Sequence, residues 1–173
     1  MSRSSRVESD LLLGEWACLG IVAQEPTHGF AVAARLKIDG DIGRIWSLTR
    51  PLTYRALDRL TSIGYVEPVR EEQGVAGGNR TIIRITRSGR AQLSRWLGTP
   101  TTHLRDVRSE FLLKLTLAEM LGFEVRPLIR EQKKIVDRIL KGLVSEGPAT
   151  NDHVTAWRIE TAEAARRFLD QLS

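Results

Sequence analysis

One short amphipathic helix, between Thr49 and Gly64, constrains the fold of this chain more than any other feature. Thr49 can cap its start, Pro51 suits its first turn, and Gly64 suits the left-handed residue that closes a helix. Apolar residues at helical spacing predict one buried face: Leu52, Ala56, Leu57, Leu60 and Ile63. The opposite face carries Tyr54, Arg55, Asp58 and Ser62. A DNA major-groove reader needs such a face, although a solvated surface helix has the same pattern.

Two shorter helices are expected before this one. The first covers about residues 10–23, with Ser9 or Asp10 as its cap. The second covers about residues 28–37, with Thr27 as its cap. Its inward residues are predicted to be Phe30, Ala33 and Ala34. Trp46 is expected to pack beneath the third helix.

Two short strands are predicted after the third helix. Residues 65–70 and the β-branched run 80–85 flank a glycine-rich tip over 71–79, and Pro68 marks the first strand as an edge or bulged strand. Three helices followed by two strands are the order of a winged helix-turn-helix, in which the wing follows the DNA backbone or minor groove. Five arginines and no acidic residues lie between Arg80 and Arg95.

The rest of the chain is predicted to be helical. Thr86 caps a helix through about Leu97, and the segment 98–100 then divides a DNA-binding domain, 1–98, from a helical domain, 99–173. Three helices are expected in the second domain: 103–121, 124–144 and 152–172. The last two carry apolar stripes with no second core to cover them, which favours a homodimer interface. The alternative is a helical hairpin folded back on its own winged domain. The expected fold class is therefore mainly α with a small β-wing.

Composition is consistent with a folded protein that meets a polyanion. The net charge is +5 and the pI is about 9.9. Residues 1–98 hold 14 Lys and Arg against 10 Asp and Glu, so most of the basic excess lies in the first domain. The single cysteine, Cys18, lies in an apolar run and is expected in the core. No apolar run approaches the roughly 18 residues of a membrane span and no signal peptide is evident, so a cytoplasmic location is expected.

Enzyme signatures are missing from the sequence. The three histidines, His28, His103 and His153, lack metal-ligand spacing. The chain has no Gly-x-Ser-x-Gly nucleophile motif. Its glycine-rich segment lies between two predicted strands and not before a helix, as a phosphate-binding loop would. We therefore expect no catalytic site, metal or cofactor.

Several segments together resemble the PadR family of bacterial transcriptional regulators. In family order they are Leu19-Gly20-Ile21-Val22, Thr27-His28-Gly29-Phe30, Trp46-Ser47-Leu48, Leu52-Thr53-Tyr54-Arg55-Ala56-Leu57-Asp58-Arg59-Leu60, Gly64-Tyr65-Val66-Glu67, Gly77-Gly78-Asn79-Arg80, Ile83-Arg84-Ile85-Thr86-Arg87-Ser88-Gly89-Arg90 and Arg108-Ser109-Glu110-Phe111-Leu112-Leu113-Lys114-Leu115. The resemblance implies a dimeric winged-helix repressor whose third helix and wing contact operator DNA. It also implies that Tyr54 touches the DNA backbone and that His28 lies near phosphate. Where the family has glycine, a hydroxyl residue and leucine before the tyrosine, this chain has Pro51-Leu52-Thr53, which predicts a different operator.

The resemblance also implies a small aromatic effector, bound near the dimer interface. Three tryptophans are candidates to line its pocket: Trp16, Trp96 and Trp157. Each is equally explained as an ordinary core residue.

The candidate DNA contacts lie on the second helix, the third helix and the wing. They are His28, Arg50, Thr53, Tyr54, Arg55, Arg59, Asn79, Arg80 and Arg84. Arg50 and Arg55 are the strongest, because a guanidinium binds guanine or phosphate with two hydrogen bonds. Two other functions fit the same pattern: a winged-helix protein-interaction module that assembles through its C-terminal helices, and a helical ligand-binding protein without DNA affinity.

Overall fold

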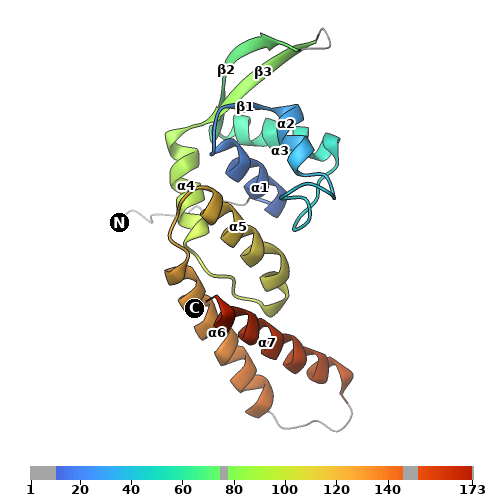
Figure 1. Cartoon of the computed structure of the whole chain (residues 1–173), viewed down its shortest axis with the longest axis vertical. Coiled ribbons are helices and arrows are strands. Elements are labelled where there is room, and N and C mark those ends of the chain that lie inside the picture. Colours follow the sequence, from blue (N-terminus) through green and yellow to red (C-terminus); the bar gives the residue numbers. More distant parts are fainter. Residues whose placement is uncertain (1–10, 75–77, 146–151, 173) are drawn as a thin grey trace, which may run out of the picture. The chain divides into compact units, whose positions relative to one another are not determined.

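The computed structural model describes residues 11–74, 78–145 and 152–172, and divides the chain into two compact units, Met1–Arg95 and Trp96–Ser173. The described residues are mainly helical, with one three-stranded antiparallel sheet (Figure 1). The expected fold class, a winged helix-turn-helix followed by a helical region, is confirmed. A division into separate domains at residue 98 stays a prediction.

Three helices form the body of the first unit. They are α1 (Leu13–Val22), α2 (Gly29–Arg35) and α3 (Arg50–Ser62), and both α1 and α2 pack against α3. Gly64 follows α3 with φ +75°, which confirms the predicted left-handed end of that helix. Cys18 is fully buried in α1, and burial raises the pKa of its thiol to about 12. Cys18 is therefore an inert core residue, as predicted.

The starts of α1 and α2 differ from the predicted caps. Leu12 is the residue before α1, and its N–H donates to the Glu15 carboxylate over 2.8 Å. The predicted caps of α1, Ser9 and Asp10, lie outside the described residues. Thr27, the predicted cap of α2, forms a short strand with His28. The side chain of His28 caps α2 instead.

Three strands build the wing. β1 (Thr27–His28) and β2 (Val66–Gln73) pair with the two sides of β3 (Asn79–Ile85), in the order β1-β3-β2. The register of β2 shifts between Pro68 and Arg70, which confirms the predicted bulge on an edge strand. Figure 1 shows β2 and β3 extending together past the helices of the first unit.

The helix after the wing begins as predicted. The Thr86 hydroxyl accepts the N–H of Gly89 over 3.1 Å and caps α4 (Arg87–Leu97).

The prediction of a single α-helix over residues 103–121 is wrong in detail. A 3₁₀ turn, Leu104–Asp106, and a π-helical turn, Val107–Phe111, precede the regular helix α5 (Leu112–Met120). The apolar spacing of this segment fits an α turn and a π turn equally well, so periodicity could not separate them.

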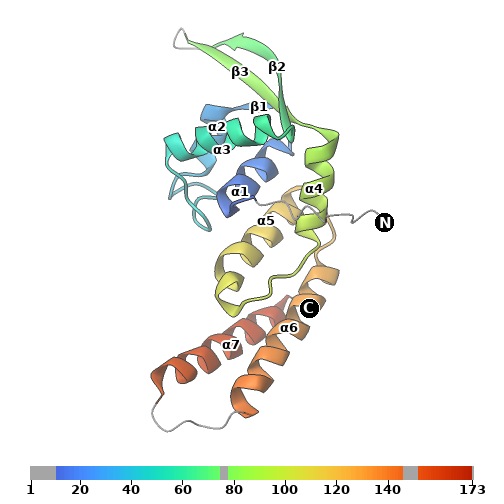
Figure 2. The same ribbon diagram turned by 180° about the vertical axis from the view of Figure 1, so that it is seen from behind.

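Two long helices complete the second unit. α6 (Arg126–Ser145) and α7 (His153–Gln171) pack side by side, as both ribbon views show (Figure 2). The turn predicted between them falls on residues 145–151, of which 146–151 lie outside the described residues. One apolar cluster of the unit comprises Val107, Phe111, Leu115, Leu128, Ile129, Val136, Ala165 and Leu169.

The apolar stripe predicted on α7 lies mostly outside this core. Its residues are Val154, Trp157, Thr161, Ala164, Phe168 and Leu172. Val154 is 65% exposed and Trp157 is 72% exposed, whereas α7 buries Ala162, Ala165 and Leu169 instead. Phe168 packs against the apolar cluster of the unit, so we call the other five residues the open face of α7.

Candidate nucleic-acid interface

The buried face of α3 keeps Ala56, Leu57 and Leu60 as predicted, but has Thr53 in place of Leu52. Thr53, Ala56, Leu57 and Leu60 are buried, and their positions follow the helical spacing of three and four residues. Leu52 is 44% exposed and Ile63 is 41% exposed, so their predicted place on the buried face is wrong. Trp46, expected beneath α3, is 39% exposed.

Thr53 is excluded as a DNA contact by its burial. Its side chain is fully buried, and its hydroxyl donates to the carbonyl oxygen of Thr49 over 3.1 Å. A hydroxyl that bonds the preceding turn can be buried without an unmet hydrogen bond. Thr53 therefore anchors α3, and the assignment of this residue to DNA is corrected. Thr49 precedes the helix as predicted but makes no capping hydrogen bond through its side chain.

Arg50, Tyr54 and Arg55 lie on the exposed side of the first turns of α3. Tyr54 packs over the start of α2, where a Cβ atom added to Gly29 would lie 2.7 Å from a ring carbon of Tyr54. Gly29 is therefore needed for the tyrosine ring to reach this place. Arg55 makes no ion pair or hydrogen bond within the described residues.

His28 joins α2 to the wing. Its Nδ1 atom accepts the N–H of Ala31 over 3.2 Å, and its Nε2 atom lies 3.4 Å from Nη1 of Arg80. The guanidinium of Arg80 only donates, and whether Nε2 of His28 accepts from it depends on the tautomer of the ring. Arg80 has further N–H donors, which suit an anionic oxygen.

These side chains line a groove between α3, the start of α2 and the wing. The groove has a volume of about 570 Å³. Its wall includes His28, Phe30, Tyr54, Asn79 and Arg80. Five residues from three elements that are distant in sequence are thus brought together. Phe30, predicted to face inward, is 50% exposed here, and Ala34 is exposed as well.

Arg59 has a partner within the fold, although 51% of its side chain is exposed. Its Nε atom lies 3.2 Å from the carboxylate of Glu15, whose side chain is 7% exposed. The carboxylate also accepts the Leu12 N–H at the start of α1. A nearly buried carboxylate needs such partners, so Arg59 binds α3 to α1.

We expect Arg59→Ala to lower the free energy of unfolding by about 1–3 kcal/mol, because Glu15 would lose its cationic partner. Urea denaturation followed by circular dichroism measures this. The double variant Glu15→Gln/Arg59→Ala should recover much of the loss, since a neutral amide needs no counter-charge. A stable Arg59→Ala variant that binds DNA poorly would instead show that Arg59 contacts DNA.

The wing is less basic than its sequence indicates. Arg84 pairs with Glu67 on the neighbouring strand over 2.8 Å, and Arg70 pairs with Glu72 over 2.7 Å. The segment from Arg80 to Arg95 holds no acidic residue, but Glu67 and Glu72 lie on β2, the strand that pairs with β3. Asn79, at the first position of β3, is exposed. Among the wing candidates, Arg80 is the one directed toward α2.

The three candidate effector tryptophans do not share one pocket. Trp16 is 5% exposed in the first unit. In the second unit, the Trp96 ring lies 4.8 Å from the amine of the buried Lys114, which also bonds Glu110 and the carbonyl oxygen of Thr99. Burial lowers the pKa of this amine, because desolvation disfavours its charged form.

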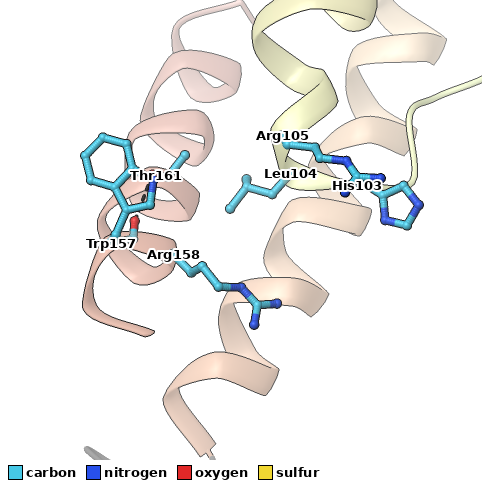
Figure 3. A pocket seen from close by; sticks show the side chains of 6 residues that line it. All are labelled: His103, Leu104, Arg105, Trp157, Arg158 and Thr161. Atoms are coloured by element: carbon cyan, nitrogen blue, oxygen red, sulfur yellow. Dashed lines mark hydrogen bonds between the residues drawn. The ribbon is translucent and has the colours of Figure 1, made fainter. Parts of the chain in front are cut away.

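Trp157 does line a pocket. This pocket, of about 330 Å³, is formed in the second unit by His103, Leu104, Arg105, Trp157, Arg158 and Thr161. Figure 3 shows the side chains arising from α7 and from the segment that leads into α5, with both guanidinium groups on the same side of the pocket.

The described residues form neither a metal site nor a membrane span. No group of three or more His, Cys, Asp or Glu side chains in residues 11–74, 78–145 and 152–172 is placed to hold a metal ion. Within the same ranges, no helix is both long and apolar enough to cross a membrane.

Comparison with solved structures finds similar chains. They include Bacillus subtilis PadR in complex with operator DNA (18% identity, 91% of this chain and 96% of that chain covered, TM-score 0.48). Bacillus subtilis PadR in complex with p-coumaric acid is 17% identical, with 92% and 93% covered and a TM-score of 0.44. The protein smu.1604c from Streptococcus mutans UA159 is 19% identical, with 92% and 98% covered and a TM-score of 0.47. No curated protein sequence matches the chain.

A family model matches the part of the chain that carries the groove. Residues 18–95 match the model of the transcriptional regulator PadR-like family. These residues run from α1 through α2, α3 and the wing into α4. The winged helix-turn-helix part of the chain, residues 18–95, therefore matches the PadR-like family of transcriptional regulators.

Proposed function

We propose that this chain acts in the cytoplasm as a homodimeric repressor, which binds a two-fold operator through α3 and the wing. The observation that carries the proposal is the set of exposed cations on α3 and in the groove beside it. Arg50 and Arg55 lie at the exposed start of α3, and Arg80 lines the groove together with His28 and the acidic Asp58. An arginine on an exposed helix can reach a base edge, and a guanidinium in the groove suits a phosphate.

The groove supports a specific docking geometry. It lies between α3 and the wing, so in this proposal the wing follows the DNA backbone while α3 enters the major groove. Tyr54 lines the groove with its ring held against Gly29. A phenolic hydroxyl in this position would fix the helix on the backbone without reading sequence.

The open face of α7 supports homodimer formation. Trp157 and Val154 are the most exposed large apolar side chains of the second unit's described residues. Exposed apolar side chains at helical spacing favour association with a second helix of the same kind. A two-fold dimer would pair the open face of each α7 with its counterpart, because a two-fold interface uses the same patch twice.

The pocket beside Trp157 supports control by an effector. It joins an indole ring to the guanidinium groups of Arg105 and Arg158, a combination that suits a planar aromatic ligand with an acidic group. Trp157 also belongs to the open face of α7. A ligand held here would change the packing of the two helices, and hence the spacing of the two DNA-binding units.

Fluorescence anisotropy with a duplex from upstream of the protein's own gene tests the proposal. With about four to six phosphate contacts per dimer, raising salt from 50 to 200 mM should weaken binding about 100- to 1,000-fold. Sedimentation equilibrium should show a dimer at micromolar concentration. In the same titration, an aromatic carboxylate that acts as effector should weaken binding. A monomer without affinity for this duplex or for any enriched from a random library would contradict the proposal, and would favour a protein-interaction module.

A further inference from the structure

Phe30 is the exposed aromatic residue of α2 at the groove, and the packing of the core does not account for it. It lies at the second position of α2 and half of its side chain is exposed. Leaving such a ring in water forgoes the stabilisation that burial would provide. The exposed ring is instead in contact with charged side chains of the groove.

Two arginines from different elements approach this ring. The guanidinium carbon of Arg50, from α3, lies 5.4 Å from the centroid of the Phe30 ring. The guanidinium carbon of Arg80, from β3, lies 6.0 Å from the same centroid. Arg50 also lies 5.7 Å from the centroid of the Tyr54 ring, and the His28 ring stacks on Phe30 with 6.4 Å between centroids. Both guanidinium groups therefore lie close to the one Phe30 ring.

An arginine that must bind DNA benefits from being held in place beforehand. A free arginine side chain loses rotamer entropy when it is fixed. A cation over an aromatic face is attracted by the ring quadrupole, which reduces the part of this cost that remains at binding. The negative face also offsets the repulsion between two guanidinium groups that would otherwise move apart.

We propose that Phe30 is a positioning residue, which preorganises Arg50 and Arg80 and so couples the wing to α3. The proposal rests on the DNA-binding function given above and adds a residue that the candidate contacts did not include. Phe30 itself needs no contact with a base. It acts through the two arginines, so its effect should depend on their presence.

Replacement of the ring by an aliphatic side chain tests this role. Phe30→Leu keeps an apolar side chain and removes the aromatic face, and should weaken operator binding about three- to ten-fold. Phe30→Tyr keeps the face and should bind like the wild type. Phe123→Leu is the matched control, because Phe123 is 38% exposed in the second unit. Equal binding by Phe30→Leu and the wild type would overturn the proposal.

A double-mutant cycle separates positioning from simple packing. Arg50→Ala and Arg80→Ala should show coupled effects on DNA affinity in the wild type and additive effects in Phe30→Leu. Additive effects in both backgrounds would contradict the coupling.

Nuclear magnetic resonance of the free protein supplies a readout without DNA. Nε–H resonances of Arg50 and Arg80 should carry ring-current shifts that fall in Phe30→Leu, with Arg50 keeping only the part due to the Tyr54 ring. Shifts that are present in a wild type without DNA affinity would sink the proposed function alone. Shifts that are absent while the wild type binds DNA would sink the role of Phe30 alone.

Discussion

The double variant Arg50→Ala/Arg55→Ala should bind operator DNA about 100- to 1,000-fold more weakly than the wild type, since each arginine contact with a base or phosphate contributes about 1–3 kcal/mol. Both residues lie at the exposed start of α3, and Arg55 has no ion-pair partner within the described residues. Neither side chain supports the core. The loss should therefore appear in affinity and leave the free energy of unfolding nearly unchanged.

Salt dependence and a matched control make this result specific. Each lost phosphate contact should lower the slope of log affinity against log salt by about one. Arg126→Ala/Arg138→Ala removes the same charge from exposed positions of α6 and should change affinity little. Equal losses in both double variants would mean that DNA responds only to net charge. Unchanged affinity in Arg50→Ala/Arg55→Ala would refute the assignment of α3 as the reading helix.

Leu60→Ala should cost about 2–5 kcal/mol of stability, because truncation of a buried leucine removes apolar contacts and leaves a cavity. Leu60 is fully buried on the face of α3 that packs in the first unit. Thermal and urea denaturation of the purified variant measure the loss. DNA affinity should fall with the folded fraction, since the groove exists only when α3 is seated.

Leu52→Ala is the control on the same helix. Leu52 is 44% exposed, so its truncation should change stability by about 0.5 kcal/mol or less. The two variants thus decide whether α3 buries Leu60 alone, as in the structure, or both leucines, as apolar spacing predicts. A similar loss of stability in Leu52→Ala and Leu60→Ala would mean that both leucines are buried.

The order of elements could be predicted from the sequence because strong local signals mark it. Pro51, Gly64 and Thr86 delimit helices by backbone chemistry that acts within a few residues. The β-branched run of β3 and the proline bulge of β2 are local signals of the same kind. Tyr54, Arg55, Asp58 and Ser62 lie on the exposed side of α3, as helical spacing predicts.

The remaining features depend on partners that are distant in sequence. Thr53 is buried in place of Leu52 because its hydroxyl bonds the preceding turn, which apolar periodicity ignores. Arg59 was assigned to DNA because nothing near it in the chain reveals Glu15, more than 40 residues earlier. Phe30 was expected in the core, since an exposed aromatic is explained only when Arg50 and Arg80 are seen beside it.

Selection of bound duplexes from a random library tests the central claim most directly, because it assumes no operator. If two copies of this chain present two α3 helices to DNA, the enriched sequences will share a two-fold-symmetric motif. Its half-sites will lie one helical turn apart, about 10 base pairs centre to centre, or a multiple of that spacing. Enrichment of a single asymmetric site, or no enrichment over the starting library, would contradict the account.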